Sequence, residues 1–210
     1  MIQKYKKILL TAALGLSLTV ATAQAEAKET SAQVAVESAA MEMMDFINTQ
    51  KLSPTKVDIR KIENLLNPII DFNGIARAVM GKHRKTMNDD QKTAFNRVFK
   101  ETMVNLYSKS FTEFDITNIN VKPIENQTDK KAAASMVVTE ASGKKYNVNY
   151  SLRLVDGNWK VRNVILDGVN MGLTYRNQFN SAMTQYDGDI EKVISSWNAT
   201  VNGNEHIATK

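Results

Sequence analysis

The chain has 210 residues, of which 43% are hydrophobic and 23% charged, and it contains no cysteine. Without cysteine there can be neither a disulfide nor a lipid-modified N-terminal cysteine, so the fold must be stabilised by its apolar core. The formal charge of +5 falls to +2 once three lysines near the N-terminus are set aside, because 24 basic residues then face 22 acidic ones. This excess is too small to indicate a nucleic-acid-binding protein.

Residues 1–25 have the three-part pattern of a secretory signal peptide. Three lysines precede an apolar run at 8–21, and the small residues at 23–25 suit a signal peptidase. The run is about 14 residues long, whereas a membrane-spanning helix needs roughly 20. We therefore expect cleavage after the last alanine of this triplet and a single soluble domain at 26–201 in the periplasm.

The N-terminal part of this domain is predicted to be helical. Apolar residues recur at helical spacing over 31–49 and again from about Asp58, with the segment 51–54 between the two runs. Asp71 can cap a third helix, which we expect to stop at Gly81, because glycine readily takes the left-handed conformation that closes a helix. The dense basic segment that starts at Gly81 is interpreted as a solvated loop, with contact to a phosphate or an acidic partner as the alternative.

The longest helix is predicted to begin after Asn88. Asn88 is a capping side chain, the next two residues are acidic, and Gln91 stands where the partner of a capping box is expected. Apolar residues from Phe95 to Tyr107 then recur so that they line one broad face of the helix.

From Asp115 the hydrophobic period changes to two, which predicts strands. In the third strand apolar and polar residues alternate strictly, which indicates one buried and one wet face of the sheet. The alternation slips between Val161 and Val164, as a β-bulge at 162–163 would cause. Short turns join the strands into an antiparallel meander, with strands predicted at 115–122, 132–140, 145–154 and 159–167.

Two helices, at 169–185 and 189–199, and a polar flexible tail at 202–210 complete the chain. We therefore predict an α+β fold in which helices pack on one face of a curled four-stranded antiparallel sheet. The spacing of the apolar residues is that of an ordinary core, and by itself it requires no ligand pocket.

Several short motifs occur in a fixed order along the chain. Residues 157–161 read Gly-Asn-Trp-Lys-Val, 167–169 read Asp-Gly-Val, and 175–179 read Tyr-Arg-Asn-Gln-Phe. An earlier block at 71–91 combines Phe-x-x-Ile-Ala-Arg with a basic segment and an acid-rich helix start. With these motifs the chain resembles, over nearly its whole mature length, the periplasmic phospholipid-binding family of the Mla (maintenance of lipid asymmetry) and toluene-tolerance transport systems.

The chain departs from the pattern of that family at three positions. Arg162 and Asn163 stand where Tyr-Asp is common, and Asn170 stands where serine is common. We expect these three positions to lie on the surface, where they would affect partner contacts more than the fold.

The resemblance implies a cone-like fold related to the NTF2 group, with a deep apolar pocket between the helices and the sheet. Such a pocket would take the acyl chains of a phospholipid as cargo, with no other cofactor, no metal and no catalytic residue. The side chains that we expect to line it are Phe72, Ile75, Val79, Phe99, Met103, Tyr107, Tyr146, Val148, Tyr150, Val164, Val169 and Leu173.

The resemblance further implies a soluble, monomeric phospholipid carrier that shuttles lipid between outer-membrane and inner-membrane Mla complexes and so maintains the lipid asymmetry of the outer membrane. Its expected partners are an outer-membrane lipoprotein–porin complex and an inner-membrane ABC transporter with its MCE-domain protein. A carrier is physically useful, because exposing an acyl tail of about 16 carbons to water costs on the order of 13 kcal/mol, at roughly 0.8 kcal/mol per methylene.

Two alternatives stay open from the sequence. An NTF2-like periplasmic enzyme would use a buried carboxylate as its base, and Asp71, Asp167 and Glu140 are the candidates, although a helix cap and a corner are expected at the first two. A protein that binds small hydrophobic molecules would have the same apolar pocket. His83 and His206 are the two histidines of a chain without cysteine, so a transition-metal site of histidine and cysteine ligands is not expected.

Overall fold

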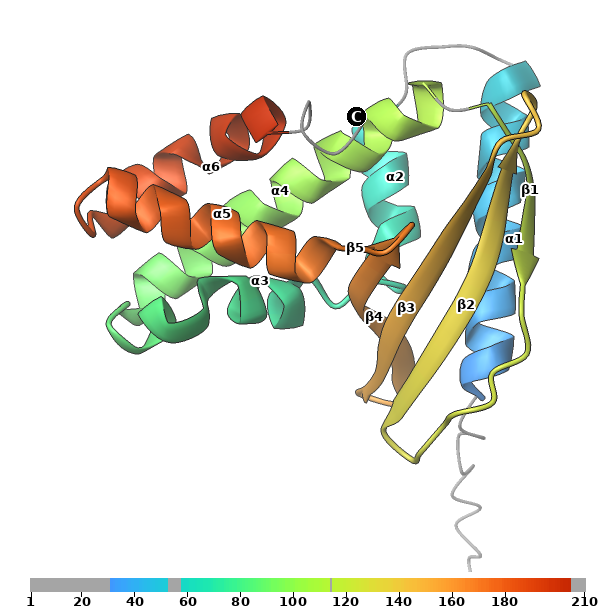
Figure 1. Ribbon diagram of the computed structural model, residues 1–210, viewed down its shortest axis with the longest axis horizontal. Helices are drawn as coiled ribbons and strands as arrows, with labels where there is room; N and C mark the ends of the chain where they lie inside the picture. The colour runs from blue at the N-terminus through green and yellow to red at the C-terminus, as the bar shows by residue number, and fades with distance from the viewer. Residues whose placement is uncertain (1–30, 53–57, 114, 205–210) are drawn as a thin grey trace, which may run out of the picture.

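The computed structural model describes residues 31–52, 58–113 and 115–204, so the predicted signal peptide and residues 205–210 lie outside the described part of the chain. A curled antiparallel sheet stands beside a bundle of helices, and one long helix runs along the sheet (Figure 1). The predicted α+β class is confirmed. The helices are α1 (Ala32–Leu52), α2 (Ile59–Leu66), α3 (Phe72–Met80), the short 3₁₀ helix η1 (Gly81–Lys85), α4 (Asp89–Glu113), α5 (Met171–Gln185) and α6 (Ile190–Asn204).

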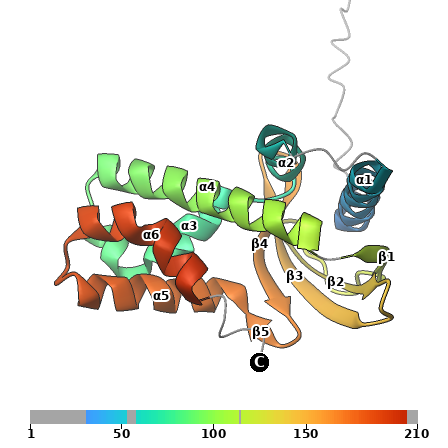
Figure 2. The ribbon, with the colours of Figure 1, turned by 90° about the horizontal axis from the view of Figure 1, so that it is seen from above.

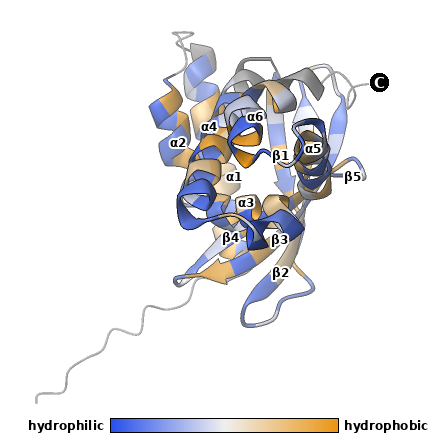
Figure 3. Cartoon of the chain, turned by 90° about the vertical axis from the view of Figure 1, so that its left-hand side faces the viewer, coloured by the Kyte–Doolittle hydropathy of each residue, from blue (hydrophilic) through white to orange (hydrophobic). Residues whose placement is uncertain are grey.

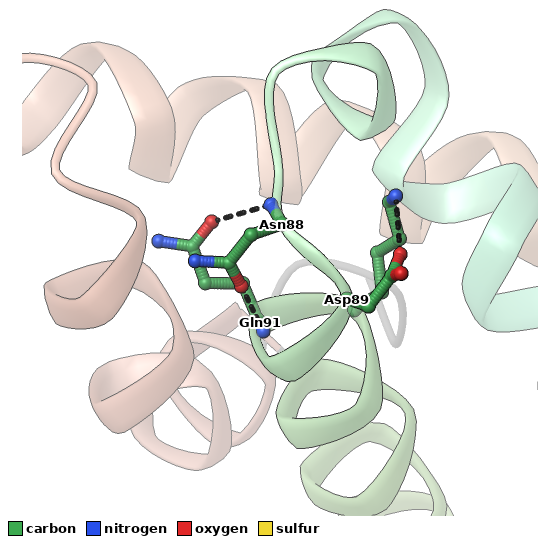
Figure 4. A network of polar contacts seen from close by, with 4 residues as sticks. Asn88, Asp89 and Gln91 are labelled. Atoms are coloured by element: carbon green, nitrogen blue, oxygen red, sulfur yellow. Dashed lines mark hydrogen bonds and ion pairs between the residues drawn. The ribbon is translucent and has the colours of Figure 1, made fainter.

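Side-chain caps decide where several of these helices begin. The capping box predicted at the start of α4 is confirmed, because the Gln91 N–H donates to Asn88 Oδ1 at 2.8 Å and the Asn88 N–H donates to Gln91 Oε1 at 3.0 Å (Figure 4). Asp58 accepts a hydrogen bond from the Arg60 N–H at 3.0 Å at the start of α2. At the other end of the chain, α6 runs through Asn204, five residues beyond the end predicted from the sequence.

The sheet has five strands, one more than predicted. Asp167 and Gly168 have φ angles of 46° and 86°, so both lie in the left-handed region and form a two-residue hairpin turn. This turn returns Val169 and Asn170 to the edge of the preceding strand, and the helix predicted from Val169 begins only at Met171. The strands, in their order across the sheet, are β1 (Ile116–Val121), β2 (Lys131–Glu140), β3 (Lys145–Val155), β4 (Asn158–Leu166) and β5 (Val169–Asn170).

The predicted β-bulge lies at Arg162. Ser151 of β3 pairs with Asn163, whereas the next residue of β3 pairs with Val161, so Arg162 is the extra residue of β4. The Arg162 side chain reaches beyond the edge of the sheet, and its Nη1 lies 2.5 Å from Oδ2 of Asp71. The expectation that Arg162 is a surface residue is therefore wrong, because the bulge turns it into a link between the sheet and α3.

The same ion pair explains the glycine in the first turn of α3. Asp71 caps this helix by accepting a hydrogen bond from the Gly74 N–H at 2.8 Å, so its carboxylate is shared between the cap and the ion pair. A Cβ atom on Gly74 would lie 1.9 Å from Arg162 Nη1 and 2.4 Å from Asp71 Oδ2. Backbone contacts tie the same region to the sheet, since the Asp71 N–H donates to the carbonyl of Val161 and the Val161 N–H donates to that of Ile69.

The helices divide into two groups around the sheet. Seen from above, α1 lies along the inner side of the curl next to β1 and β2, whereas α3, α4, α5 and α6 extend away from β4 as a bundle (Figure 2). The amide of Gln33 in α1 anchors this helix, because its Oε1 accepts a hydrogen bond from the Ile124 N–H at 2.7 Å. Within the described ranges no helix is long and apolar enough to cross a membrane.

The bundle is held by a cluster of aromatic rings. Phe95, Phe179 and Trp197 are fully buried, and the ring of Phe95 meets the other two edge-on at centroid distances of 4.8 and 5.1 Å. Figure 3, which looks along the bundle, shows hydrophobic stretches of α4 and α6 facing its centre. Tyr175 and Phe179 of the predicted Tyr-Arg-x-Gln-Phe motif are both buried, so this part of the motif forms core.

The basic segment after α3 is helical, which corrects its interpretation as a loop. Residues Gly81–Lys85 form η1, and His83 within it lies 3.0 Å from the side-chain oxygen of Asn180 on α5. The guanidinium of Arg176 covers Gly81 so closely that a Cβ atom there would lie 2.8 Å from its Nε. Arg176 therefore packs against the end of α3, as expected for a residue that ties α5 to its neighbours.

Candidate functional site

An apolar cavity of about 270 Å³ lies between the helical bundle and the sheet. Its walls come from α3, α4 and the first turn of α5 on one side and from β3 and β4 on the other. None of the described side chains that line it is charged. They are Ile70, Phe72, Ile75, Phe99, Met103, Leu106, Tyr107, Val148, Tyr150, Val161, Asn163, Val164, Leu166, Met171, Gly172 and Tyr175.

The apolar residues of the cavity walls follow two periodicities in the sequence, one of a strand and one of a helix. On the sheet side, Val148 and Tyr150 point inward because alternate residues of β3 face the same way, and the bulge brings both Val161 and Val164 of β4 to that face. On the helical side, α4 contributes a stripe spaced by three and four residues, which begins at Phe99. The cavity is thus the space that remains where an apolar helix stripe faces an apolar sheet surface.

Asn163 supplies the main polar contact at the cavity wall. Its Oδ1 accepts a hydrogen bond from the Gly172 N–H at 3.0 Å, which satisfies a backbone donor at the start of α5. A Cβ atom on Gly172 would lie 2.4 Å from the same oxygen, so glycine allows the helix to approach β4 closely. Asn170 caps α5 by accepting from the Leu173 N–H at 3.0 Å. Asn163 and Asn170, both expected at the surface, therefore have structural roles at partly buried positions.

Three tyrosines line the cavity, Tyr107, Tyr150 and Tyr175, and the first two have a raised pKa. Burial raises the pKa of Tyr107 above its ordinary value. Burial also raises the pKa of Tyr150, and the neighbouring Tyr107 raises it further. A phenol whose pKa is raised keeps its proton, so neither group places a negative charge in the cavity.

The structure brings eight of the twelve predicted side chains together around this cavity. Seven of them come from regions whose periodicity was clear, namely the stripe of α4, the first turns of α3 and the inward face of β3. The eight are Phe72, Ile75, Phe99, Met103, Tyr107, Val148, Tyr150 and Val164.

The other four predicted side chains do not line it, for local reasons. Val79 is fully buried one turn beyond Ile75, deeper in the helical bundle. Tyr146 lies near the β2–β3 turn, where its hydroxyl donates to Glu140 Oε1 at 3.0 Å. Val169 and Leu173 are 44% and 53% exposed, because the turn into β5 carries them to the outside of the corner.

This exposed corner adjoins the cavity. Leu166 lines the cavity and is itself 39% exposed, and it stands directly opposite Val169 in the β4–β5 pair. The corner is held by reciprocal contacts, since the Asp167 N–H donates to the Asn147 carbonyl at 2.9 Å and the Asn147 N–H donates to Asp167 Oδ1 at 2.8 Å. Apolar surface therefore continues from the cavity to the outside at a well-supported turn.

Comparison with known proteins identifies the family. Residues 19–199 match the family described as MlaC protein. The chain belongs to the MlaC family. The resemblance predicted from the motifs at 71–91 and 157–179 is therefore confirmed.

Two proteins to which this MlaC-family chain is similar agree with that assignment. The toluene tolerance protein ttg2D of Pseudomonas putida is 34% identical over 137 residues, which are 65% of this chain and 64% of that protein. A solved structure, the phospholipid-binding protein from Ralstonia solanacearum in complex with a phospholipid, superposes with a TM-score of 0.68 at 20% identity. The superposition covers 81% of this chain and 97% of that one, which shows that the two share a fold.

The carboxylates that the sequence left as candidate bases have other partners in this MlaC-family fold. Asp71 caps α3 and pairs with Arg162, Asp167 accepts from the Asn147 N–H, and Glu140 accepts from a tyrosine hydroxyl. None of the three lines the cavity. In the described part of the chain, histidine and acidic side chains form no group of three or more that could hold a metal ion.

The lining residues that the sequence did not predict depend mostly on contacts between distant segments. Ile70 reaches the cavity through an isolated parallel bridge to Val161, which no local pattern signals. Asn163 and Gly172 meet because of the bulge and the β5 turn. Leu106, by contrast, belongs to the same stripe as Phe99 and could have been found from its spacing alone.

Proposed function

We propose that this protein is a soluble periplasmic phospholipid carrier, which holds acyl chains in the cavity while it passes lipid between an outer-membrane and an inner-membrane complex. The observation that carries the proposal is the uncharged, mainly apolar lining of a cavity whose apolar surface extends to the outside at Leu166. Membership of the MlaC family supports it, as do the toluene tolerance relative and the phospholipid-bound relative with the same fold.

The energetics favour uptake into such a lining. An acyl tail of about 16 carbons loses on the order of 13 kcal/mol of transfer free energy when it leaves hydrocarbon for water. Side chains such as Phe99, Met103 and Val148 replace that hydrocarbon at little net cost, so the carrier can both accept and release the tail. The neutral Tyr107 and Tyr150 phenols add no charge that would oppose this transfer.

The size of the cavity implies that its walls separate when lipid enters. Its volume of about 270 Å³ is below the range of about 300–1,000 Å³ that pockets for drug-sized ligands occupy, and a phospholipid is larger than such ligands. The corner that carries Leu166, Val169 and Leu173 is the side at which we place the entry of the tail, because apolar side chains there are exposed next to the cavity.

In this account the protein carries lipid without a covalent step. The Tyr107 and Tyr150 phenols, whose pKa is raised, keep their protons. The carboxylates of Asp71, Asp167 and Glu140 are engaged in structural contacts. The partners we propose are an outer-membrane lipoprotein–porin complex and an inner-membrane ABC transporter with an MCE-domain protein. Transport between these partners would maintain the lipid asymmetry of the outer membrane.

The test is extraction of fluorescent phospholipid from vesicles by the purified protein, followed by separation of protein from vesicles. Val148→Phe combined with Val164→Phe fills the cavity from the sheet side with apolar volume, and we expect most of the extraction to be lost. Val137→Phe is the matched control, because this residue lies on the opposite, wet face of β2 and pairs with Asn147. Equal extraction by all three proteins, each shown to be folded, would contradict the proposal.

A further inference from the structure

A second hollow, of about 650 Å³, shares no described lining residue with the lipid cavity. It is an open groove where the start of β2 and the end of β3 meet the β1–β2 connection and α3. Ala133 of β2 and Ser151 of β3 pair with each other, and their small side chains point away from the core. The residues lining the groove are Ala78, Glu125, Asn126, Gln127, Thr128, Lys131, Ala132, Ala133, Ser151, Leu152, Arg153 and Arg162.

Three basic side chains stand in a row across neighbouring strands, and two of them, Lys131 and Arg153, line the groove. Lys131 of β2 pairs directly with Arg153 of β3, and Arg153 pairs directly with Lys160 of β4. Like charges placed opposite one another destabilise a sheet, so this row of basic residues does not stabilise the pairing of the strands. Lys160 donates a hydrogen bond to the Asn67 carbonyl at 3.3 Å, whereas neither Lys131 nor Arg153 has an ion pair with any described residue.

Acidic side chains do little to offset this charge. The outward positions of β2 and β3, which alternate from Lys131 to Thr139 and from Lys145 to Arg153, hold no carboxylate. Glu125 is the one acidic residue among those lining the groove, and the Asp71 carboxylate is already shared between Arg162 and the cap of α3. The groove therefore presents two unpaired cations, and α3 is the one described helix that contributes to its lining.

We propose that this groove is a docking site for an extended, acidic segment of a partner protein. Carboxylates of the segment would pair with Lys131 and Arg153 at the rim, while its backbone lies over the small side chains of Ala133 and Ser151. An extended segment suits the shape, because it can enter a hollow that a broad surface would only bridge.

A bilayer surface fits the groove less well than a protein segment does. A flat layer of head groups cannot reach a recessed floor, and nothing on this face would insert into the acyl region. Among the described residues, the exposed large apolar side chains all belong to α1, α2 or the β4–α5 corner, and none of them lines the groove; they are Val34, Met41, Ile59, Leu166, Val169 and Leu173.

Docking in this groove would leave the lipid cavity free. The cavity is lined by inward residues such as Val148 and Tyr150, and none of the described residues lines both sites. The protein can therefore bind an acidic partner segment whether or not the cavity holds lipid.

The experiment measures binding of a fluorescein-labelled oligoglutamate peptide to the full chain by fluorescence anisotropy, at low and at high salt. Lys131→Gln combined with Arg153→Gln should weaken binding roughly tenfold at low salt, as expected for the loss of two exposed ion pairs. Arg97→Gln combined with Lys192→Gln makes the same change of net charge on α4 and α6, away from the groove, and should leave the affinity unchanged.

Two further measurements keep the outcome decisive. Ser151→Tyr fills the floor without changing the charge and should also weaken binding, whereas the melting temperature of the Lys131/Arg153 variant should not fall, because like-charge repulsion is removed. Equal losses in the groove and control variants would overturn the proposal, since net charge alone would then explain binding. It would also be overturned by an absence of peptide binding, or by tighter binding to phosphatidylglycerol vesicles than to the peptide.

Discussion

The junction of Asp71 with Arg162 allows the stability of the fold to be tested one interaction at a time. The side chains of Asp71 and Arg162 are 12% and 31% exposed, so their ion pair lies between the surface case, worth about 0.2–1 kcal/mol, and the buried case, where loss of one partner costs about 3–5 kcal/mol. Asp71→Asn removes the charge but keeps an oxygen that can cap α3 through the Gly74 N–H. We therefore expect it to lower the free energy of unfolding by about 2 kcal/mol.

Asp71→Ala removes both contacts and should cost about 1 kcal/mol more than Asp71→Asn, because the cap is also lost. Urea unfolding followed by circular dichroism measures both values, and a loss of about 2 kcal/mol should lower the melting temperature by roughly 4–8 °C for a domain of this size. Equal stability of the two variants would refute the view that one carboxylate serves both contacts. A folded Asp71→Asn protein that no longer binds lipid would refute the purely structural role of Asp71.

Three further predictions concern the core, the cavity and the corner. Phe179→Ala should destabilise the protein by about 3–5 kcal/mol in denaturant unfolding, because the ring is fully buried against Phe95, and a loss below 1 kcal/mol would contradict this packing. Burial raises the pKa of Tyr107 and Tyr150, so above pH ~10 these phenols ionise in the unfolded chain before they ionise in the folded protein. The stability that they contribute should therefore be present below pH ~10 and be lost as the pH rises above it. Replacing both tyrosines with phenylalanine should reduce this alkaline loss in pH-dependent unfolding; an unchanged loss would contradict it. Leu173→Ser should slow lipid transfer between vesicles with a change in stability within about 0.5 kcal/mol, whereas the control Met41→Ser, at another exposed apolar position on α1, should transfer lipid normally.

Local patterns in the sequence predict those parts of the fold that depend only on residues close together in the chain. The capping box at Asn88 and the alternation along β3 each need only a few adjacent positions, and the structure has both. The slip of alternation between Val161 and Val164 likewise locates the bulge correctly.

What the sequence could not predict depends on where distant segments meet. A bulge at Arg162 can be recognised locally, but its side chain finds Asp71 only because α3 starts beside the edge of β4. The corner at Asp167–Gly168 is visible in the sequence, yet whether the next two residues continue into a helix or pair with β4 depends on the cap that Asn170 provides. The same turn decides that Val169 and Leu173 lie outside the cavity and Met171 inside it.

The most direct test of the carrier account is native mass spectrometry of the protein purified from the periplasm without detergent, followed by identification of extracted lipids. The account predicts a complex whose added mass is that of phospholipid, lost in the variant in which Val148 and Val164 are changed to phenylalanine. A mass equal to that of the bare chain, unchanged after incubation with phospholipid vesicles, would contradict it.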